Sequence, residues 1–209
     1  MHEKVLPRGS RDLLAKLERL NRPELDGWTL AGGTGLALQL GHRVSEDFDY
    51  FRVGPFPPNR LHEVLRSVGD VETLQEDDRT LTVMVLRTKV SFFSVPDPFI
   101  FPGQSYSFFQ LAGIPDIALM KLAAISGRGS RKDFIDLYTI LRGGSSLQEF
   151  FQRLRDKYGE GRVNAYHVLK SLTYFEDAEL EPMPRMLEPF DWKECKSFFV
   201  REAHAIVLP

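Results

Sequence analysis

The chain has 209 residues, of which 43% are hydrophobic and 27% are charged. This composition is typical of a folded globular protein and excludes a disordered or low-complexity chain. The net charge of -2 excludes the overall basic field of most nucleic-acid binders, so any contact with a polynucleotide needs a local basic patch.

Cysteine content and hydropathy narrow the class of protein further. The single cysteine, Cys195, cannot form an intramolecular disulfide, and no cysteine and histidine spacing resembles a zinc site. No apolar run approaches the ~20 residues that cross a membrane, and the N-terminus has no charged-then-apolar leader. We therefore expect a cytoplasmic protein with no membrane contact.

The first quarter of the chain predicts alternating helices and strands. Ser10 is expected to cap a leucine-striped helix that Pro23 ends. Asp and aromatic residues then alternate at period two over 47–51, which predicts a strand with one carboxylate face and one buried face. The expected elements here are a helix from about 10 to 22, a strand at 28–31, a Gly-Gly turn at 32–33, a helix at about 34–41 and a strand at 47–51.

The remaining pattern predicts three more strands and then helices alone. A helix near 59–67 precedes strands at 71–74, 81–86 and 90–94, with turns at 77–78 and 87–88. This order favours a mixed, mostly antiparallel sheet. Helices are expected at 114–126, 130–141, 147–158, 162–175 and 191–207. We therefore expect an α+β protein with a core at 1–105 and a helical lobe, packed on the core, at 106–209.

Asp47 and Asp49 are the first candidate functional residues. Two carboxylates two apart on a strand project from one face, about 6–7 Å apart, and can share divalent cations. Nucleotidyl transfer needs such ions to neutralise triphosphate charge and to activate the attacking hydroxyl. The pair therefore predicts a magnesium platform, although paired acids on a strand are more often solvated edge residues.

The Gly32-Gly33 turn is the second candidate. A glycine turn that opens directly into a helix offers backbone N–H groups and a positive helix end to phosphate oxygens, and Thr34 adds a hydroxyl. Alone, such a turn is usually only a tight turn. The chain order is strand, Gly-Gly, helix and then Asp-x-Asp, which brings the turn and the acids to adjacent strand ends. Together the two motifs predict a functional site more strongly than either motif alone.

Two segments resemble the AbiEii/AbiGii toxin family. The first is LAGGTGLALQLGHRVSEDFDYF at residues 30–51, and the second comprises DIALMKLAAIS at 116–126 and RGSRKDFIDLY at 128–138. The resemblance spans about residues 25–142. It implies a polymerase-beta-like nucleotidyltransferase core with a C-terminal helical lobe, in which Asp47 and Asp49 bind magnesium and Lys121 and Asp136 complete the site. It also implies a bacterial toxin encoded beside a winged-helix antitoxin, with some members transferring nucleotides to RNA.

The residues of the second segment allow two interpretations. Lys121 and Arg128 lie two turns apart on one helix face and can grip triphosphate or RNA backbone, although Lys121 can equally snorkel from an apolar helix. Ser130 and Asp133 form a helix capping-box pattern, which is our preferred role for Asp133. Lys132, a further candidate for nucleotide binding, and Asp136 are also spaced for a surface ion pair.

The sequence lacks one acid that polymerase-like nucleotidyltransferases usually carry, which limits the prediction of catalysis. Polymerase-like nucleotidyltransferases usually carry a third carboxylate on a later strand, but residues 90–95 contain no acid, and the nearest, Asp97, lies between two prolines. We therefore expect a magnesium-dependent nucleotidyltransferase that moves a nucleotide from an NTP to RNA, such as tRNA, or to protein. The main alternative is a catalytically degenerate nucleotide-binding module that acts by protein association. A phosphohydrolase is the third reading.

Overall fold

The computed structural model describes residues 1–208, which form two compact units, Met1–Gly113 and the residues from Ile114 onwards. In the first unit, short 3-10 turns at Glu3–Val5 and Pro23–Leu25 accompany three helices and seven strands. The helices are α1 (Arg8–Leu20), α2 (Gly32–Leu40) and α3 (Pro58–Arg66). The strands are β1 (Thr29–Leu30), β2 (Phe48–Val53), β3 (Val71–Asp77), β4 (Thr80–Val85), β5 (Thr88–Val95), β6 (Gln104–Tyr106) and β7 (Phe109–Leu111).

The seven strands form one mixed sheet in the order β3-β4-β5-β2-β1-β7-β6. Four neighbouring pairs are antiparallel, whereas β2 with β5 and β1 with β7 are parallel. The prediction of a mixed, mostly antiparallel sheet is therefore confirmed. The predicted pattern missed β6 and β7, which are three residues each, and their pairing beside β1 extends the first unit to Gly113.

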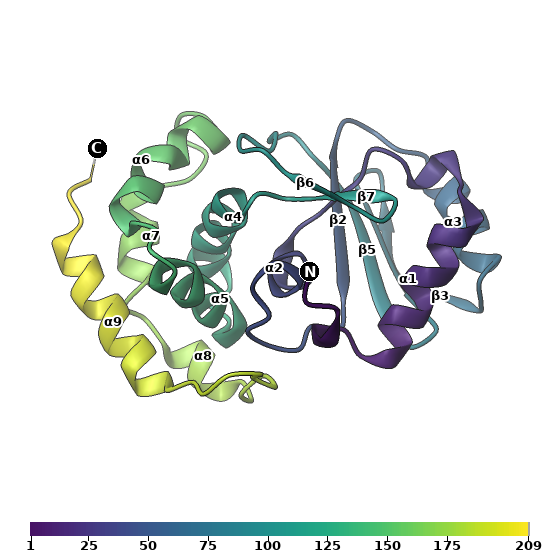
Figure 1. The fold of residues 1–209 in the computed structure, drawn as a ribbon. Coiled ribbons are helices and arrows are strands. Elements are labelled where there is room, and N and C mark those ends of the chain that lie inside the picture. Colours follow the sequence, from purple (N-terminus) through teal and green to yellow (C-terminus); the bar gives the residue numbers. More distant parts are fainter. Residues whose placement is uncertain (209) are drawn as a thin grey trace. The chain divides into compact units, whose positions relative to one another are not determined.

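Helices lie on both faces of this sheet. In Figure 1 the sheet is seen close to edge-on, with α1 and α3 on one side and α2 on the other. The helix α1 presents Leu13, Leu14 and Leu17 to the sheet, as its leucine spacing predicts. The helix α2 begins directly after β1, so its N-terminus lies at the end of a central strand.

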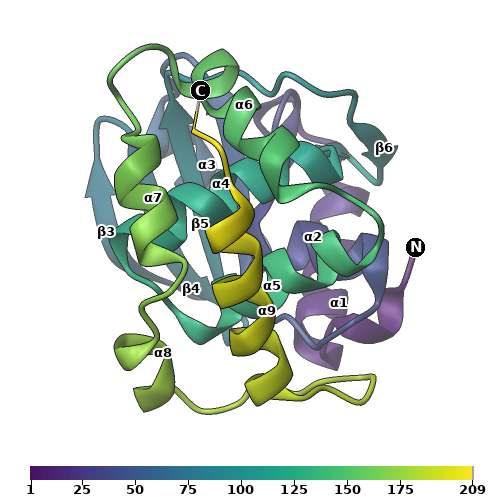
Figure 2. The same ribbon diagram turned by 90° about the vertical axis from the view of Figure 1, so that its left-hand side faces the viewer.

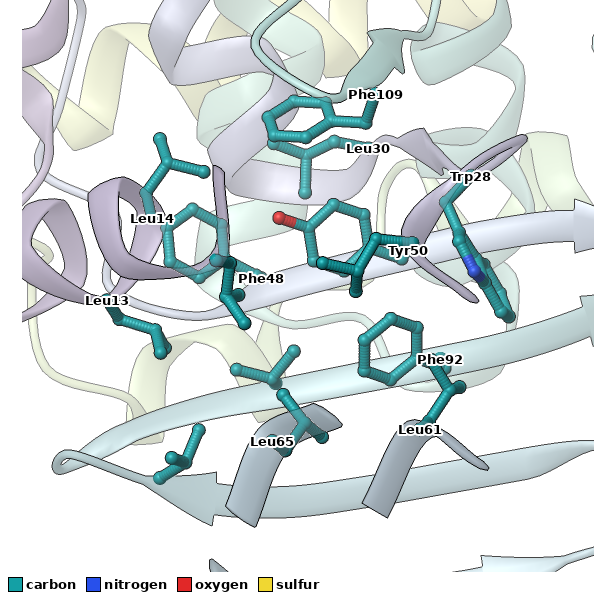
Figure 3. Packing of buried hydrophobic residues seen from close by; sticks show 14 of the residues in the cluster. Leu13, Leu14, Trp28, Leu30, Phe48, Tyr50, Leu61, Leu65, Phe92 and Phe109 are labelled. Atoms are coloured by element: carbon teal, nitrogen blue, oxygen red, sulfur yellow. The ribbon is translucent and has the colours of Figure 1, made fainter. Parts of the chain in front are cut away.

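The core of the first unit is built largely from aromatic and leucine side chains. Figure 3 shows Tyr50 stacked against Phe92, with Trp28 packed edge-on to the same phenylalanine. Phe48 and Tyr50 are each 1% exposed. Their burial confirms the alternation predicted for this strand and leaves the intervening Asp49 on the opposite face.

One predicted helix start is wrong. The helix α1 begins at Arg8, after Pro7, and Ser10 lies inside it as a buried residue. Its hydroxyl donates to the carbonyl oxygen of Glu46 at 3.0 Å, and Ser10 does not occupy the N-cap position, where its oxygen would accept from a helix-terminal amide. Ser10 therefore ties α1 to the segment that leads into β2.

The second unit contains only helices among its described residues. They are α4 (Ile114–Gly127), α5 (Arg131–Arg142), α6 (Leu147–Tyr158), α7 (Ala165–Ser171), α8 (Glu176–Leu180) and α9 (Trp192–Ala205). Figure 2 looks onto this unit, where α9 lies against α5. The single long helix predicted over 162–175 is wrong, because Asn164 caps α7 and the chain turns after Ser171 before α8 begins.

The capping prediction for the last helix is confirmed. Asp191 accepts hydrogen bonds from the backbone amides of Lys193 and Glu194. The aromatic residues of α9 belong to the core, as predicted, since Trp192 and Phe199 both pack on Phe134. Across residues 1–208, no helix is long and apolar enough to cross a membrane.

Candidate active site

The candidate carboxylates lie at the start of β2, beside the start of β5. In the parallel register of these strands, Asp49 lies opposite Ser91. Asp47 immediately precedes β2, and its side chain is 44% exposed. The two acids are therefore on the face opposite the buried Phe48 and Tyr50, as predicted.

Gly32 allows the Asp49 carboxylate to lie against the first turn of α2. The backbone N–H of Ala31 donates to the carbonyl oxygen of Asp49 at 3.1 Å, so the strand pairing continues up to the helix. A Cβ atom on Gly32 would lie 3.1 Å from Asp49 Oδ2, and Gly32 has φ +60°, which favours glycine. The backbone conformation therefore favours glycine here, and its missing side chain lets the Asp49 carboxylate approach the helix N-terminus closely.

Gly33 makes room for a buried arginine. A Cβ atom at this position would lie 2.4 Å from Arg43 Nη2 and 3.3 Å from Ser45 Oγ. Arg43 is 2% exposed, and its Nη1 donates to the carbonyl oxygen of Val44 at 3.1 Å. The Gly-Gly sequence is thus not a separate turn but the first turn of α2, with a cation packed against it.

The backbone amides at this helix start are placed for an anion. The first intrahelical bond joins Gly35 N–H to Ala31 O, so the amides of Gly32, Gly33 and Thr34 precede the helical ladder. The helix dipole adds partial positive charge at the same end. This arrangement can accept phosphate oxygens through backbone N–H groups.

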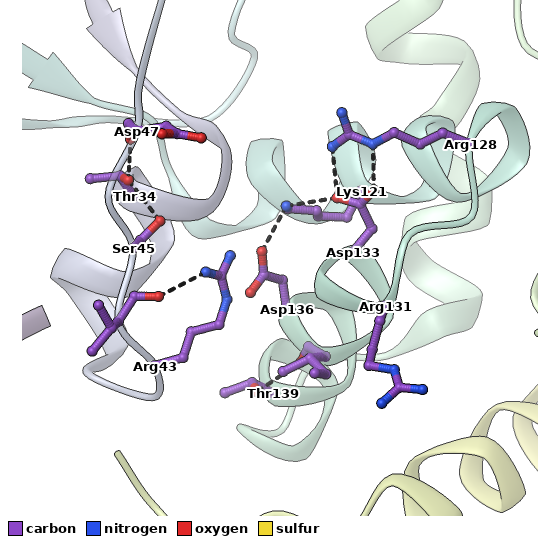
Figure 4. A network of polar contacts seen from close by, with 12 residues as sticks. Thr34, Arg43, Ser45, Asp47, Lys121, Arg128, Arg131, Asp133, Asp136 and Thr139 are labelled. Carbon is purple, nitrogen blue, oxygen red and sulfur yellow. Dashed lines mark hydrogen bonds and ion pairs between the residues drawn. The ribbon is translucent and has the colours of Figure 1, made fainter. Parts of the chain in front are cut away.

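The Thr34 hydroxyl has interior partners. Thr34 is 2% exposed; its hydroxyl donates to the carbonyl oxygen of Asp47 and lies 2.8 Å from Ser45 Oγ. Figure 4 shows this chain of contacts leading from Thr34 to Asp47 and Ser45. The side chain therefore ties α2 to the backbone of the acid pair, so the Thr34 hydroxyl is engaged inside the first unit.

A lysine stands beside the acid pair. Lys89 Nζ lies 3.1 Å from Asp47 Oδ2, and both side chains are about two-fifths exposed, at 40% and 44%. In the register of β2 and β5, Lys89 and Ser91 are the residues next to Asp47 and Asp49. The neighbouring strand thus presents a cation and a hydroxyl where polymerase-like enzymes usually present a third acid.

The acid pair suits an open magnesium site, in which the protein supplies only some of the ligands, better than a site closed by protein ligands alone. Magnesium is usually held by one or two carboxylates together with substrate phosphates. Asp49, lodged against Gly32, and Asp47 supply two such carboxylates. Over residues 1–208, no group of three or more His, Cys, Asp or Glu side chains gathers as a metal site, so other ligands would have to come from a bound nucleotide and water.

The second unit holds a buried cluster of charges. Lys121, on α4, is 5% exposed, and its Nζ lies 2.9 Å from Asp133 Oδ1 and 2.6 Å from Asp136 Oδ2 on α5. Figure 4 shows the lysine between the two carboxylates. The interpretation of Lys121 as a snorkelling surface lysine is therefore wrong, because its ammonium is buried and bridges two acids.

Arg128 joins the same cluster from the end of α4. Its Nε lies 2.7 Å from Asp133 Oδ2 and its Nη2 lies 3.1 Å from Asp133 Oδ1, although its side chain is 68% exposed. Burial raises the pKa of Asp133, but the Lys121 charge and the Arg128 hydrogen bonds outweigh it and hold the pKa below its usual value. Lys121 and Arg128 thus reach the same carboxylate and point to one side, as predicted, although Arg128 follows the last residue of α4.

Two structural roles predicted for this segment are wrong. The Ser130 side chain makes no capping hydrogen bond, and Asp133 is fully buried in ion pairs, so the two residues do not form a capping box. Asp136 is likewise fully buried and pairs with Lys121, whereas Lys132 is exposed. A surface pair between Lys132 and Asp136 is therefore excluded by burial.

Each unit thus gathers part of the predicted set. The first unit brings together Asp47, Asp49, Gly32, Gly33 and Thr34; the second brings together Lys121, Arg128 and Asp136 around Asp133. The sequence did not predict that Lys89 lies beside Asp47 or that Asp133 is the centre of the buried ion cluster. Pairing the predicted strands in parallel would have placed Lys89 beside Asp47, whereas the capping pattern at Ser130 hid the buried role of Asp133.

Solved structures of two other proteins share this fold. A nucleotidyltransferase toxin from Mycobacterium tuberculosis H37Rv superposes with a TM-score of 0.61 over 93% of this chain and 80% of its own, at 16% identity. A Helicobacter pylori structure gives the same TM-score over 98% of this chain and 92% of its own, at 20% identity. Similarities of this kind establish the fold, a nucleotidyltransferase core followed by C-terminal helices, and the fold prediction is confirmed.

Sequence comparison identifies the family. The model described as "Nucleotidyl transferase AbiEii toxin, Type IV TA system" matches residues 15–206. The chain therefore belongs to the AbiEii nucleotidyltransferase toxin family of type IV toxin–antitoxin systems. An uncharacterized protein of Aquifex aeolicus (strain VF5) is 36% identical over 178 residues, which cover 83% of this chain and 84% of that protein.

Proposed function

We propose that this nucleotidyltransferase uses magnesium to transfer a nucleotide from an NTP to an RNA acceptor, such as tRNA. The observation that carries the proposal is the Asp49 carboxylate lodged against Gly32 at the start of α2. An acid held beside free helix-terminal amides suits a triphosphate that must be neutralised both by protein N–H groups and by a cation.

We propose the following roles for the residues of the first unit. The amides of Gly32, Gly33 and Thr34 bind phosphate oxygens, and the nearby Arg43 adds positive charge to this end of α2. Asp47 and Asp49 hold the magnesium ion, which when bound neutralises the triphosphate and polarises the reacting phosphoryl group. Thr34 and Ser45 position the acid pair by fixing the backbone at Asp47.

The reaction itself is a displacement at the α-phosphorus of the NTP. An acceptor hydroxyl forms the new P–O bond, the bond to the β-phosphate oxygen breaks, and pyrophosphate leaves with that electron pair. The acceptor proton passes to a base, for which Asp49 is our candidate. The acidic face of β2 thus serves both ion binding and proton acceptance.

Lys121, Asp136, Arg128 and Lys132 enter the proposal from the family resemblance. We propose that Lys121 and Asp136 contribute to catalysis and that Arg128 and Lys132 contribute to nucleotide binding. Asp136→Asn separates this role from a purely structural one. A catalytic role predicts a loss of rate far larger than the loss of folded protein in urea unfolding, whereas a rate that tracks the folded fraction contradicts it.

The direct test of activity uses labelled nucleotides. Purified protein, magnesium, each of the four labelled NTPs and total RNA are combined, and label in RNA and in protein is measured separately. The proposal expects label in RNA that depends on magnesium and is lost in Asp49→Ala. Label in protein alone would replace the RNA acceptor with a protein acceptor, and no label from any NTP would contradict the proposal.

A second candidate function follows from Lys89. Because a cation pairs with Asp47 where a third acid would stand, a module that binds nucleotide without turnover and acts by protein association is the alternative. Calorimetry of NTP binding, together with the labelled-nucleotide assay for product, decides between the two functions. NTP binding with no product, together with a stable complex with the product of a neighbouring gene, favours the alternative.

The partner within the toxin–antitoxin pair is also a proposal. We expect a winged-helix antitoxin encoded next to this chain. Co-expression of the neighbouring gene should relieve growth inhibition caused by this protein. Growth that remains inhibited with that neighbour present, or a neighbour without a winged-helix pattern, contradicts this expectation.

A further inference from the structure

A basic groove lies between α1 and the turn that joins β4 to β5. It encloses about 480 Å³ and is lined by Gly9, Asp12, Ala15, Lys16, Arg19, Leu86 and Arg87. Three of these residues are cations. The one acid, Asp12, is paired with Arg8, which continues the same helix row, at 3.8 Å. The groove is therefore locally positive in a chain whose net charge is -2.

The donors of this groove are available to a ligand. The side chains of Arg19 and Arg87 are exposed and make no hydrogen bond or ion pair with another residue in the described part of the chain. Lys16 Nζ has a weak backbone contact, 3.4 Å from the carbonyl oxygen of Val68. Two guanidinium groups with unused N–H donors suit the oxygens of phosphate, which arginine can bind in bidentate fashion.

The turn that carries Arg87 is strained. Leu86 and Arg87 have φ +49° and +62°, in the left-handed region where a two-residue hairpin usually has Asn-Gly. Such a conformation is unfavourable for a non-glycine residue and is typically kept where function needs it. Leu86 packs on the core near Gly69, which anchors the turn, while Arg87 lines the groove.

The groove lies at the end of the sheet where the candidate acids lie, because the turn that carries Arg87 directly precedes the start of β5 beside β2. Arg87 precedes by two residues Lys89, which contacts Asp47. On the other wall, Ser10 of α1 donates to the carbonyl oxygen of Glu46, the residue before Asp47. Both walls of the groove are thus tied to the segment that carries the acid pair.

We propose that this groove binds the sugar-phosphate backbone of the RNA acceptor. The inference rests on the proposed function, because it names the surface by which that acceptor is held. Contacts of this kind are sequence-independent and position the chain rather than read its bases. A local patch of cations is also what an otherwise acidic protein needs in order to hold a polyanion.

The test measures RNA binding without magnesium and NTP, so that it is independent of nucleotide transfer. Fluorescence anisotropy of a labelled single-stranded RNA is recorded at salt concentrations from about 0.05 to about 0.3 M. Over this range, counterion release makes the affinity fall as the salt concentration rises. The wild-type chain is compared with the double variant Arg19→Gln/Arg87→Gln. The matched control is Arg153→Gln, an exposed arginine of α6 that pairs with Asp156.

The double variant should flatten the plot of log affinity against log salt by about 0.7 per removed cation, or about 1.4 in total. If the two proteins bind equally at 1 M salt, this difference in slope corresponds to about 70-fold weaker binding of the double variant at 0.05 M salt. The control should bind as the wild type does, and all three proteins should melt at similar temperatures because the altered side chains are exposed.

Equal slopes for the wild type and the double variant would overturn the proposal, even if the wild type transfers nucleotide to RNA. A flatter slope for the double variant would support it, even if no transfer is detected and the proposed activity fails. A wild type that binds no RNA but captures an acidic protein through Arg19 and Arg87 would also overturn it.

Discussion

Two glycines carry much of the site's geometry, each for a different reason. Gly32 combines a left-handed backbone with space for the close approach of the Asp49 carboxylate, whereas Gly33 leaves space for the guanidinium of Arg43. A Gly-Gly pair in a sequence suggests only a turn. The structure shows that both residues belong to the first helical turn and that both lie against charged side chains.

Gly33→Ala tests this packing. The added Cβ would lie 2.4 Å from Arg43 Nη2, so the buried arginine must move away from the start of α2. Overpacking of this kind costs about 1–3 kcal/mol. We expect lower stability in urea unfolding and weaker NTP binding in calorimetry. Gly127→Ala, at a helix position where a Cβ meets nothing within 4 Å, is the control.

Lys89→Ala tests the cation beside the acid pair. Because Lys89 competes with a divalent cation for Asp47, its removal should lower the magnesium concentration that gives half-maximal activity. The measurement is a magnesium titration of nucleotide transfer, with direct calorimetric titration of magnesium as a readout independent of rate. A higher magnesium requirement in the variant would show that Lys89 assists the metal-bound state instead.

At the scale of elements, the ion cluster between α4 and α5 links stability to pH. The pKa of Asp133 is lowered overall, so its ion pairs stabilise the fold above the unfolded pKa of about 3.9 and lose that contribution as the pH falls below it. Arg128→Gln removes two of the bonds that lower this pKa. The acid-unfolding midpoint, followed by tryptophan fluorescence, should therefore move to higher pH.

The control for this prediction is Arg153→Gln, which removes an exposed ion pair on α6 and should leave the acid midpoint unchanged. Identical acid profiles for Arg128→Gln and the wild type would contradict the role assigned to Asp133. Lys121→Met is the stronger perturbation, because it leaves two buried carboxylates without their shared cation and should cost about 3–5 kcal/mol.

The thiol of Cys195, on α9, can be used to measure how often the second unit opens locally. Cys195 is fully buried, and burial raises the pKa of its thiol, so little of the reactive thiolate forms at neutral pH. We expect the folded protein to react with a thiol reagent only at the rate at which this region opens. A modification rate in native buffer that equals the rate in urea would contradict the packing of α9.

Sequence patterns predicted the elements whose periodicity spans several residues. The leucine stripe of α1 and the alternation of Phe48 and Tyr50 with polar neighbours both correspond to observed faces. The three-residue strands β6 and β7 are too short to show a period. Ser10 and Ser130 both fit local capping patterns, but tertiary contacts at Glu46 and at the buried Asp133 override them.

At the scale of the whole molecule, family membership and the fold agree on nucleotidyl transfer, while the composition leaves the acceptor open. The acid pair could be found from the sequence because two aspartates and a glycine pair are local motifs. Lys89 and the basic groove could not, because each depends on which strand or turn lies beside another. The net charge of -2 also conceals the local excess of cations along α1.

The most direct test of the central claim is nucleotide transfer by the wild type and by Asp49→Asn, with labelled NTPs, magnesium and total RNA. Asp49→Asn keeps the size of the side chain beside Gly32, so the fold should be retained. We predict magnesium-dependent labelling of RNA by the wild type and a loss of about 100-fold or more in the variant. Equal labelling by the two proteins, with circular dichroism showing both folded, would contradict the assignment of the active site.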